Sequence, residues 1–310
     1  MTFILRRTAG RNRYYVDIDV APRHRVPGVT TIIKAMANKK LENYASSATA
    51  DYAVNNWGRT PCPDCGHAGS ELSALPAADR LRAIMGGRWD KRNEGASIGS
   101  EVHRLGEKLL DGEAVAVPEE LKGYVDSYVK FMDLSDLNAR HIEVPCYSVE
   151  HQYAGQIDII GDLVLPDLPE WEDVSRDADG RSVGVLDPKS GHGVYESAAL
   201  QLVAYRRSDF LILKGAASAD PLQREEIPMP AVDFTAAVHV HPDGRPATLV
   251  RTDSSPEAYR SFLYLRQVYD LQQTADELLY PPTPYPAQLP TAEVDPDAEL
   301  GSVPNGDFSV

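Results

Sequence analysis

The chain has 310 residues, enough for one large domain or two modest ones. Its hydrophobic fraction of 43% and charged fraction of 25% are typical of a soluble globular protein, and no stretch reaches the roughly eighteen apolar residues of a membrane-spanning helix. The opening MTFILRRTAG places charge after a very short apolar run, the wrong order for a secretory signal. Three cysteines, an odd number, argue against a disulfide framework. We therefore expect a cytoplasmic protein without membrane contact.

The charge is unevenly distributed along the chain. The formal net charge of -15 argues against a nucleic-acid partner. Residues 1–60, however, carry ten Lys and Arg against four Asp and Glu, whereas the chain after Arg266 carries eight acidic residues and no basic one. This pattern fits a basic N-terminal surface and an acidic tail. Basic N-terminal residues that contact phosphates would make binding weaken steeply with salt.

The first half of the chain predicts one strand followed by helices. Residues 14–20 alternate apolar and polar side chains and predict a strand, and an Ala-rich helix is expected from Val29 to about residue 56. Residues 58–76 lose this periodicity and predict an inserted loop or small knuckle. Helical patterning returns at 77–111, and it resumes after Pro118 to about Leu134.

The second half is rich in short β runs. Strands are expected at 141–150, 153–165 and 181–189, with an acidic, Pro-containing hairpin excursion between the last two. The pattern then predicts a helix over 195–208, strands at 210–213 and near 236–241, and a helix over 256–279. Residues 281–310 cannot bury much surface and are expected to be disordered.

Three acidic residues fall on the successive predicted strands. Asp187 and Lys189 share a face because alternate residues of a strand point the same way. Asp158 lies in an otherwise apolar strand, where burial is costly unless the carboxylate is paired or metal-bound, and Glu143 lies in the strand before it. Such a set could hold one or two Mg²⁺ or Mn²⁺ ions and poise a water molecule, and Pro188 could add its carbonyl oxygen.

Each of these residues also has a simpler interpretation. Asp187 and Lys189 could form a surface ion pair, and Glu120-Leu121-Lys122 is a second acid-x-Lys sequence in the chain. Asp158 could cap backbone amides beside a turn, and Glu143 could face solvent.

Two predicted helices add polar groups at a spacing of four. His103 and Glu107 share one helix face, and Gln201 and Tyr205 share another. The alternatives are a structural or exposed histidine and an amphipathic helix edge with a half-buried tyrosine.

Four motifs in order carry a resemblance to a known family. They are G-x-x-x-H (Gly99 to His103), G-x-I-D (Gly155 to Asp158), L-D-P-K-S-G (Leu186 to Gly191) and Q-L-x-x-Y (Gln201 to Tyr205). This set resembles the PD-(D/E)XK nucleases, and more narrowly the RecB and Cas4-type exonuclease branch encoded by many tailed bacteriophages. The opening VPGVTTIIKAMANKKLENYASSATADYAV is also similar to the N-terminal helical segment of those proteins, so the resemblance covers roughly residues 25–210.

The resemblance implies an α/β fold with a restriction-endonuclease-like mixed central β-sheet flanked by helices, and an N-terminal helical region. Asp158 and Asp187 would ligate the metal, Lys189 would orient or activate the attacking water, and His103 would add a ligand or phosphate contact. Glu143 matches an acid often found before the G-x-I-D strand, and Gln201 and Tyr205 would brace the site and the nucleic-acid backbone. The chain would divide into 1–57 (N-terminal strand and helices), 58–76 (the insert), 77–280 (the nuclease core) and 281–310 (the tail).

The expected function is a metal-dependent DNA exonuclease in phage DNA replication or recombination, with single- or double-stranded DNA ends as its partner. A structure-specific endonuclease and a non-catalytic DNA-binding protein on the same fold are the alternatives. No G-x-x-x-x-G-K-[ST] motif occurs, so any helicase or recombination partner must be a separate protein.

The cysteines allow a second metal site. Cys62, Cys65 and His67 resemble half of a zinc knuckle, which Cys146 or a second histidine could complete. Cys146 lies in a predicted strand, so free thiols in a loop are favoured over structural zinc. The iron–sulfur members of the family carry four cysteines, including a cluster after the Gln/Tyr helix, and this chain has none there, so an iron–sulfur cluster is not expected.

Overall fold

A computed structural model describes residues 4–9, 12–17, 24–36, 39–56, 72–214 and 224–279. The chain divides into a large unit, Met1–Asp270, and a small one, Leu271–Val310, whose described part is the end of the last long helix and a 3₁₀ turn. The predicted disordered tail and Cys62, Cys65 and His67 lie outside the described residues. No helix among the described residues is both long and apolar enough to cross a membrane.

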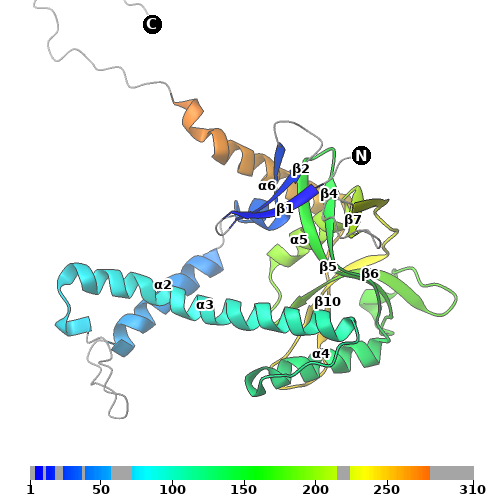
Figure 1. The fold of residues 1–310 in the computed structure, drawn as a ribbon, viewed down its shortest axis with the longest axis horizontal. Helices are drawn as coiled ribbons and strands as arrows, with labels where there is room; N and C mark the ends of the chain where they lie inside the picture. The colour runs from blue at the N-terminus through cyan, green and yellow to red at the C-terminus, as the bar shows by residue number, and fades with distance from the viewer. Residues whose placement is uncertain are drawn as a thin grey trace, which may run out of the picture. The chain divides into compact units, whose positions relative to one another are not determined.

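A mixed seven-stranded sheet forms the centre of the large unit, in the order β10-β9-β6-β5-β4-β7-β8 (Figure 1). Neighbouring strands run antiparallel, except that β6 and β9 are parallel. The strands are β4 (Asn138–Ser148), β5 (Tyr153–Val164), β6 (Arg181–Lys189), β7 (Phe210–Lys214), β8 (Arg224–Pro228), β9 (Phe234–His239) and β10 (Thr248–Arg251). The predicted α/β class and mixed, helix-flanked sheet are therefore confirmed, whereas β8 and β10 were not predicted.

Helices cover both faces of this sheet. One face packs on α3 (Ala77–Leu110) and α4 (Lys122–Ser135), through a core that includes Leu105, Tyr128 and Leu186. The other face packs on α1 (Val29–Ile33), α5 (Glu196–Arg206) and α6 (Pro256–Thr274). The short 3₁₀ turns are η1 (Leu72–Ala74), η2 (Glu119–Leu121), η3 (Pro169–Trp171) and η4 (Ala275–Leu278).

The N-terminal region differs from its prediction. The single predicted strand at 14–20 is β2 (Asn12–Asp17), the middle strand of a small antiparallel sheet with β1 (Ile4–Ala9) and β3 (His24–Pro27). The predicted continuous helix from Val29 to 56 is wrong, because α1 ends at Ile33 and α2 spans Lys39–Asn56. The amides of Ala35 and Met36 donate to carbonyls three residues back, so the chain tightens into a turn there.

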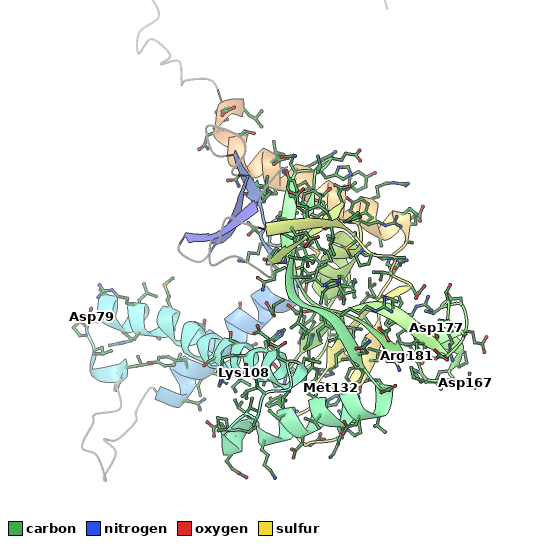
Figure 2. The ribbon with its side chains drawn as sticks, turned by 45° about the vertical axis from the view of Figure 1, so that its right-hand side comes forward. Asp79, Lys108, Met132, Asp167, Asp177 and Arg181 are labelled. Atoms are coloured by element: carbon green, nitrogen blue, oxygen red, sulfur yellow. The ribbon has the colours of Figure 1, made fainter. Side chains whose placement is uncertain are left out.

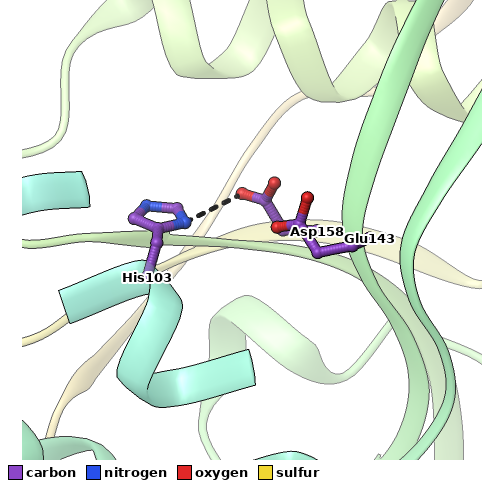
Figure 3. Close-up of side chains that lie close together, drawn as sticks. All are labelled: His103, Glu143 and Asp158. Atoms are coloured by element: carbon purple, nitrogen blue, oxygen red, sulfur yellow. Dashed lines mark ion pairs between the residues drawn. The ribbon is translucent and has the colours of Figure 1, made fainter. Parts of the chain in front are cut away.

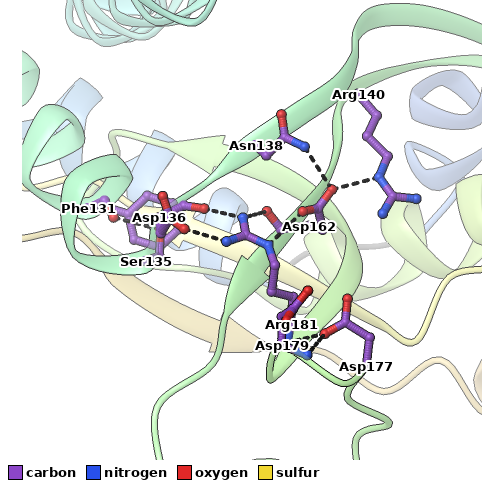
Figure 4. A network of polar contacts seen from close by, with 9 residues as sticks. All are labelled: Phe131, Ser135, Asp136, Asn138, Arg140, Asp162, Asp177, Asp179 and Arg181. Carbon is purple, nitrogen blue, oxygen red and sulfur yellow. Dashed lines mark hydrogen bonds and ion pairs between the residues drawn. The ribbon is translucent and has the colours of Figure 1, made fainter.

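The long connection between β5 and β6 is held to the rest of the fold at two points. Trp171 is buried and packs edge-on against Phe234, with ring centroids 5.3 Å apart. Where the connection enters β6, Arg181 donates a hydrogen bond to the buried carboxylate of Asp162 on β5. The same carboxylate accepts a hydrogen bond from Arg140 at 2.6 Å (Figure 4). Figure 2 labels Asp177 in the connection and Arg181 at the start of β6. The predicted acidic hairpin excursion is therefore a packed part of the fold.

Candidate functional site

A single groove with a volume of about 600 Å³ gathers nearly all the residues singled out from the sequence. Six elements contribute to its wall: α1, α3, β4, β5, β6 and α5. The predicted site residues that line it are His103, Glu143, Asp158, Asp187, Lys189, Gln201 and Tyr205. Pro188 lines a small adjoining cavity of about 20 Å³ together with His103, Glu143 and Asp158. The fold thus brings together side chains that are up to about a hundred residues apart in sequence.

The three acids form a row across neighbouring strands. The pairing of Ile142 with Ile159 and of Val144 with Ile157 sets Glu143 opposite Asp158. The next pairing, of Ile159 with Leu186, sets Asp158 opposite Asp187. The predicted placement of the three acids on successive strands therefore becomes a row that crosses β4, β5 and β6.

The sheet is irregular where this row crosses β5. In a regular strand Ile157 and Ile159 would face the same way. Instead Ile157 packs in the core beneath α1 and α5, and Ile159 packs in the core beneath α3 and α4. The residue between them is Asp158, so the alternation of side chains between the two faces of the sheet is interrupted at this acid.

The facing residue on β4 carries a matching distortion. Glu143 has a φ of 50°, in the left-handed region that non-glycine residues rarely adopt. Such a conformation costs about 1–2 kcal/mol relative to the right-handed one and persists only where the surroundings enforce it. The Glu143 side chain accepts a hydrogen bond from the Gln156 amide.

At the end of β6, Asp187 and Lys189 form the predicted pair. Asp187 is buried, with 1% of its surface exposed, and its Oδ2 lies 2.5 Å from Nζ of Lys189. The Lys189 ammonium is the positive charge that lies directly against this buried carboxylate. The alternative of an ion pair at the surface does not fit this burial.

His103 reaches the acids from α3 (Figure 3). Its Nδ1 lies 3.7 Å from Oδ2 of Asp158, and one ligand atom each from His103, Glu143 and Asp158 lies within 4.8 Å of the others. Burial lowers the pKa of His103 and outweighs the opposing charge of Asp187 and the Pro188 carbonyl, so the imidazole is neutral at pH 7 and free to act as a ligand.

The pKa of Asp158 is raised well above its ordinary value. Burial is the main cause, and the adjacent carboxyl of Asp187 adds to it, while Lys189 acts in the opposite direction. With His103 neutral, one ammonium faces the three acidic side chains of Glu143, Asp158 and Asp187, which cannot all ionise easily together. A divalent cation would offset their negative charge and favour ionisation of Asp158.

The residues present fit such an ion. His103, Glu143 and Asp158 would hold it, and Asp187, opposite Asp158 and paired with Lys189, would add a further buried carboxylate. Carboxylate-rich sites suit Mg²⁺ or Mn²⁺, to which a neutral imidazole can add. The Pro188 carbonyl accepts a hydrogen bond from His103, and its role as a metal ligand stays a prediction.

Gln201 and Tyr205 lie together on α5. The Gln201 amide donates to the Tyr205 hydroxyl at 3.1 Å, and the tyrosine ring lies against bare backbone at Gly155. A Cβ at position 155 would stand 2.2 Å from Cε1 of Tyr205, which explains the glycine of the G-x-I-D motif. The strand that carries Asp158 is thereby packed against the helix that carries Gln201.

Some groove residues were not assigned a role from the sequence. Gln156 lies two residues before Asp158, and this spacing on a strand was the signal available for it. Glu107 shares a helix face with His103, and Thr30, Ser100 and Arg104 also line the groove.

Cys146 does not fit the zinc ligand that the sequence allowed. The thiol is fully buried in the core beneath α5, and this burial raises its pKa to about 12. A thiol in this setting is a core side chain.

Comparisons with known proteins add no identification. No protein-family model matches the chain, and no curated protein is significantly similar to it.

Proposed function

We propose that this chain is a divalent-metal-dependent deoxyribonuclease of the PD-(D/E)XK type, acting as an exonuclease on DNA ends. The observation that carries the proposal is the row of Glu143, Asp158 and Asp187 across three adjacent strands, with the Lys189 ammonium 2.5 Å from the last acid. The four sequence motifs of this family converge on that row from separate elements.

The chemistry of phosphodiester hydrolysis matches these side chains. A divalent cation supplies positive charge that offsets the negative charge developing on the attacking and leaving oxygens. Lys189 would orient the attacking water, because its ammonium projects into the groove beside the acids. His103, kept neutral by burial, would complete the ligand set, and the linked side chains of Gln201 and Tyr205 would support the DNA backbone at the groove wall.

Several finer features belong to this proposal. They are a restriction-endonuclease-like topology of the mixed sheet, a cytoplasmic location in an infected bacterium, and a role in phage DNA replication or recombination beside a separate helicase or recombination protein. The basic N-terminal residues would contact phosphates; Arg11, Arg23 and Arg59 among them lie outside the described residues.

The substrate test uses end-labelled linear single- and double-stranded DNA beside covalently closed circles, with Mg²⁺, Mn²⁺ or EDTA. Metal-dependent loss of linear DNA with the circles spared is the expected result. Cleaved circles would instead indicate a structure-specific endonuclease. No cleavage with any metal would contradict the enzymatic proposal and favour a non-catalytic DNA-binding protein.

A further inference from the structure

Gln156 makes a two-point contact with Glu143 across β4 and β5. Its Nε2 donates to the Glu143 carboxylate and lies 3.3 Å from the backbone carbonyl of the same residue. Both partners are acceptors, so only the NH₂ end of the amide can face them. The orientation of the Gln156 side chain is therefore fixed by chemistry.

The other end of the amide has no partner among the described residues. Oε1 of Gln156 is buried and has no hydrogen-bond donor among the described residues. A buried polar atom without a partner is unfavourable, and such atoms are uncommon in folded proteins. The contact with Glu143 is thus made while the opposite end of the same side chain stays unsatisfied.

The contact is made to Glu143, whose backbone conformation is unfavourable for a residue other than glycine. Glu143 has a φ of 50°, which an extended strand does not enforce. Gln156 holds both its backbone carbonyl and its carboxylate, and this keeps the carboxylate beside His103 and Asp158.

The neutrality of the glutamine matters for a cation site. An Arg or Lys at position 156 would orient the carboxylate equally well but would place a positive charge against a ligand of the cation. An amide donor orients Glu143 and leaves its negative charge for the metal. Hydrogen-bond partners of metal ligands act in this way in other proteins.

We propose that Gln156 is a positioning residue that sets the affinity of the cluster formed by His103, Glu143 and Asp158 for a divalent cation. This inference rests on the proposed function, because it takes the cluster to be the metal site.

The experiment measures Mn²⁺ binding by the full chain directly, from the electron paramagnetic resonance signal of free Mn²⁺. It compares the wild type with Gln156→Met, which keeps the side-chain length and removes the donor. The matched control is Gln152→Met, because Gln152 donates to the Val149 carbonyl in the β4–β5 turn, away from the groove. Should Gln156→Met fail to fold by circular dichroism, Gln156→Ala removes the same donor without adding bulk.

The Kd for Mn²⁺ should rise about tenfold in Gln156→Met and stay unchanged in Gln152→Met. In a Glu143→Gln background, Gln156→Met should cause no further change, because the carboxylate that it positions is gone. A purely structural role would lower stability equally in both backgrounds and leave the Kd alone.

An unchanged Kd in Gln156→Met, or the same rise in the Glu143→Gln background, would overturn the role of Gln156. In either case wild-type binding of Mn²⁺ would leave the proposed function standing. Absence of Mn²⁺ binding to the wild type would overturn both.

Discussion

Glu143 and Asp158 face each other across β4 and β5, at the position where β5 changes which face of the sheet its side chains cover. Regular strands would bury or expose such residues in strict alternation. The irregularity instead brings both acids to a groove that His103 enters from α3. Local distortion of this kind is common beside active sites, and it gives the first prediction.

Glu143→Asn should stabilise the metal-free protein by about 1 kcal/mol, because asparagine tolerates the left-handed region better than glutamate. The same change should abolish the contribution of the carboxylate to metal binding. Urea denaturation in EDTA measures the first effect, and Mn²⁺ titration measures the second. A loss of stability without metal would show that the hydrogen bond from Gln156 to Glu143 stabilises the fold by more than the φ of 50° costs.

The raised pKa of Asp158 predicts a distinctive dependence of stability on pH. In the metal-free folded state this carboxyl binds its proton more tightly than in the unfolded chain, where its pKa is about 3.9. Its stabilising contribution is therefore complete below about pH 3.9 and is lost as the pH rises through the higher folded-state pKa.

Asp158→Asn should remove that loss. With EDTA present, the free energy of unfolding of the variant, measured by urea denaturation at several pH values, should exceed that of the wild type increasingly as the pH rises toward neutrality. Lowering of the His103 pKa acts in the opposite direction in both proteins, so the difference between the two curves isolates Asp158. Parallel curves would contradict a raised pKa at this carboxyl.

Gly155→Ala should destabilise the protein by about 2 kcal/mol, because the new methyl group would overlap the Tyr205 ring. Removing the ring as well should make the methyl group harmless. The combined loss in Gly155→Ala with Tyr205→Ala should therefore be smaller than the sum of the single losses, as measured by urea denaturation. Additive losses would show that the ring does not lie on Gly155.

Arg181→Ala tests whether fold stability and the site can be separated. Arg181 donates to the buried carboxylate of Asp162 at 2.7 Å, and such charged hydrogen bonds contribute about 2 kcal/mol. Burial alone would raise the pKa of Asp162, but Arg140 and Arg181 outweigh it and lower the pKa.

The loss of about 2 kcal/mol should leave DNA cleavage unchanged at temperatures where the variant is folded, because this network does not line the groove. Arg82→Ala, which breaks an exposed ion pair with Asp79, is the control and should cost less than about 0.5 kcal/mol. A selective loss of cleavage in Arg181→Ala would mean that the network of Arg181 and Asp162 influences the groove.

The sequence predicted the central strands well because their apolar pattern reflects burial. β4, β5 and β6 lie inside the sheet, and their hydrophobic runs are unambiguous. β8 and β10 were missed because they are short edge strands with polar side chains, which hydrophobic alternation does not reveal. The break between α1 and α2 was missed because Ala-rich sequence favours helix on both sides of it.

The candidate site was predictable in its composition and only partly in its geometry. Motif spacing placed Asp158, Asp187 and Lys189 at strand positions that can meet, and the sheet brings them together. The positive φ of Glu143 and its bond to Gln156 arise from pairing between strands, which no local pattern encodes. The closeness of His103 to Asp158 likewise depends on how α3 packs on the sheet.

The most direct test of the account is metal-dependent degradation of end-labelled linear DNA by Asp187→Asn and Lys189→Met. The matched controls are Glu120→Gln and Lys122→Met, which alter the other acid-x-Lys sequence at exposed positions. The first pair should lower the rate by about a hundredfold or more while circular dichroism shows that both variants are folded at the assay temperature. The controls should match the wild type. Wild-type cleavage rates in both Asp187→Asn and Lys189→Met would contradict the assignment of this site as a nuclease centre.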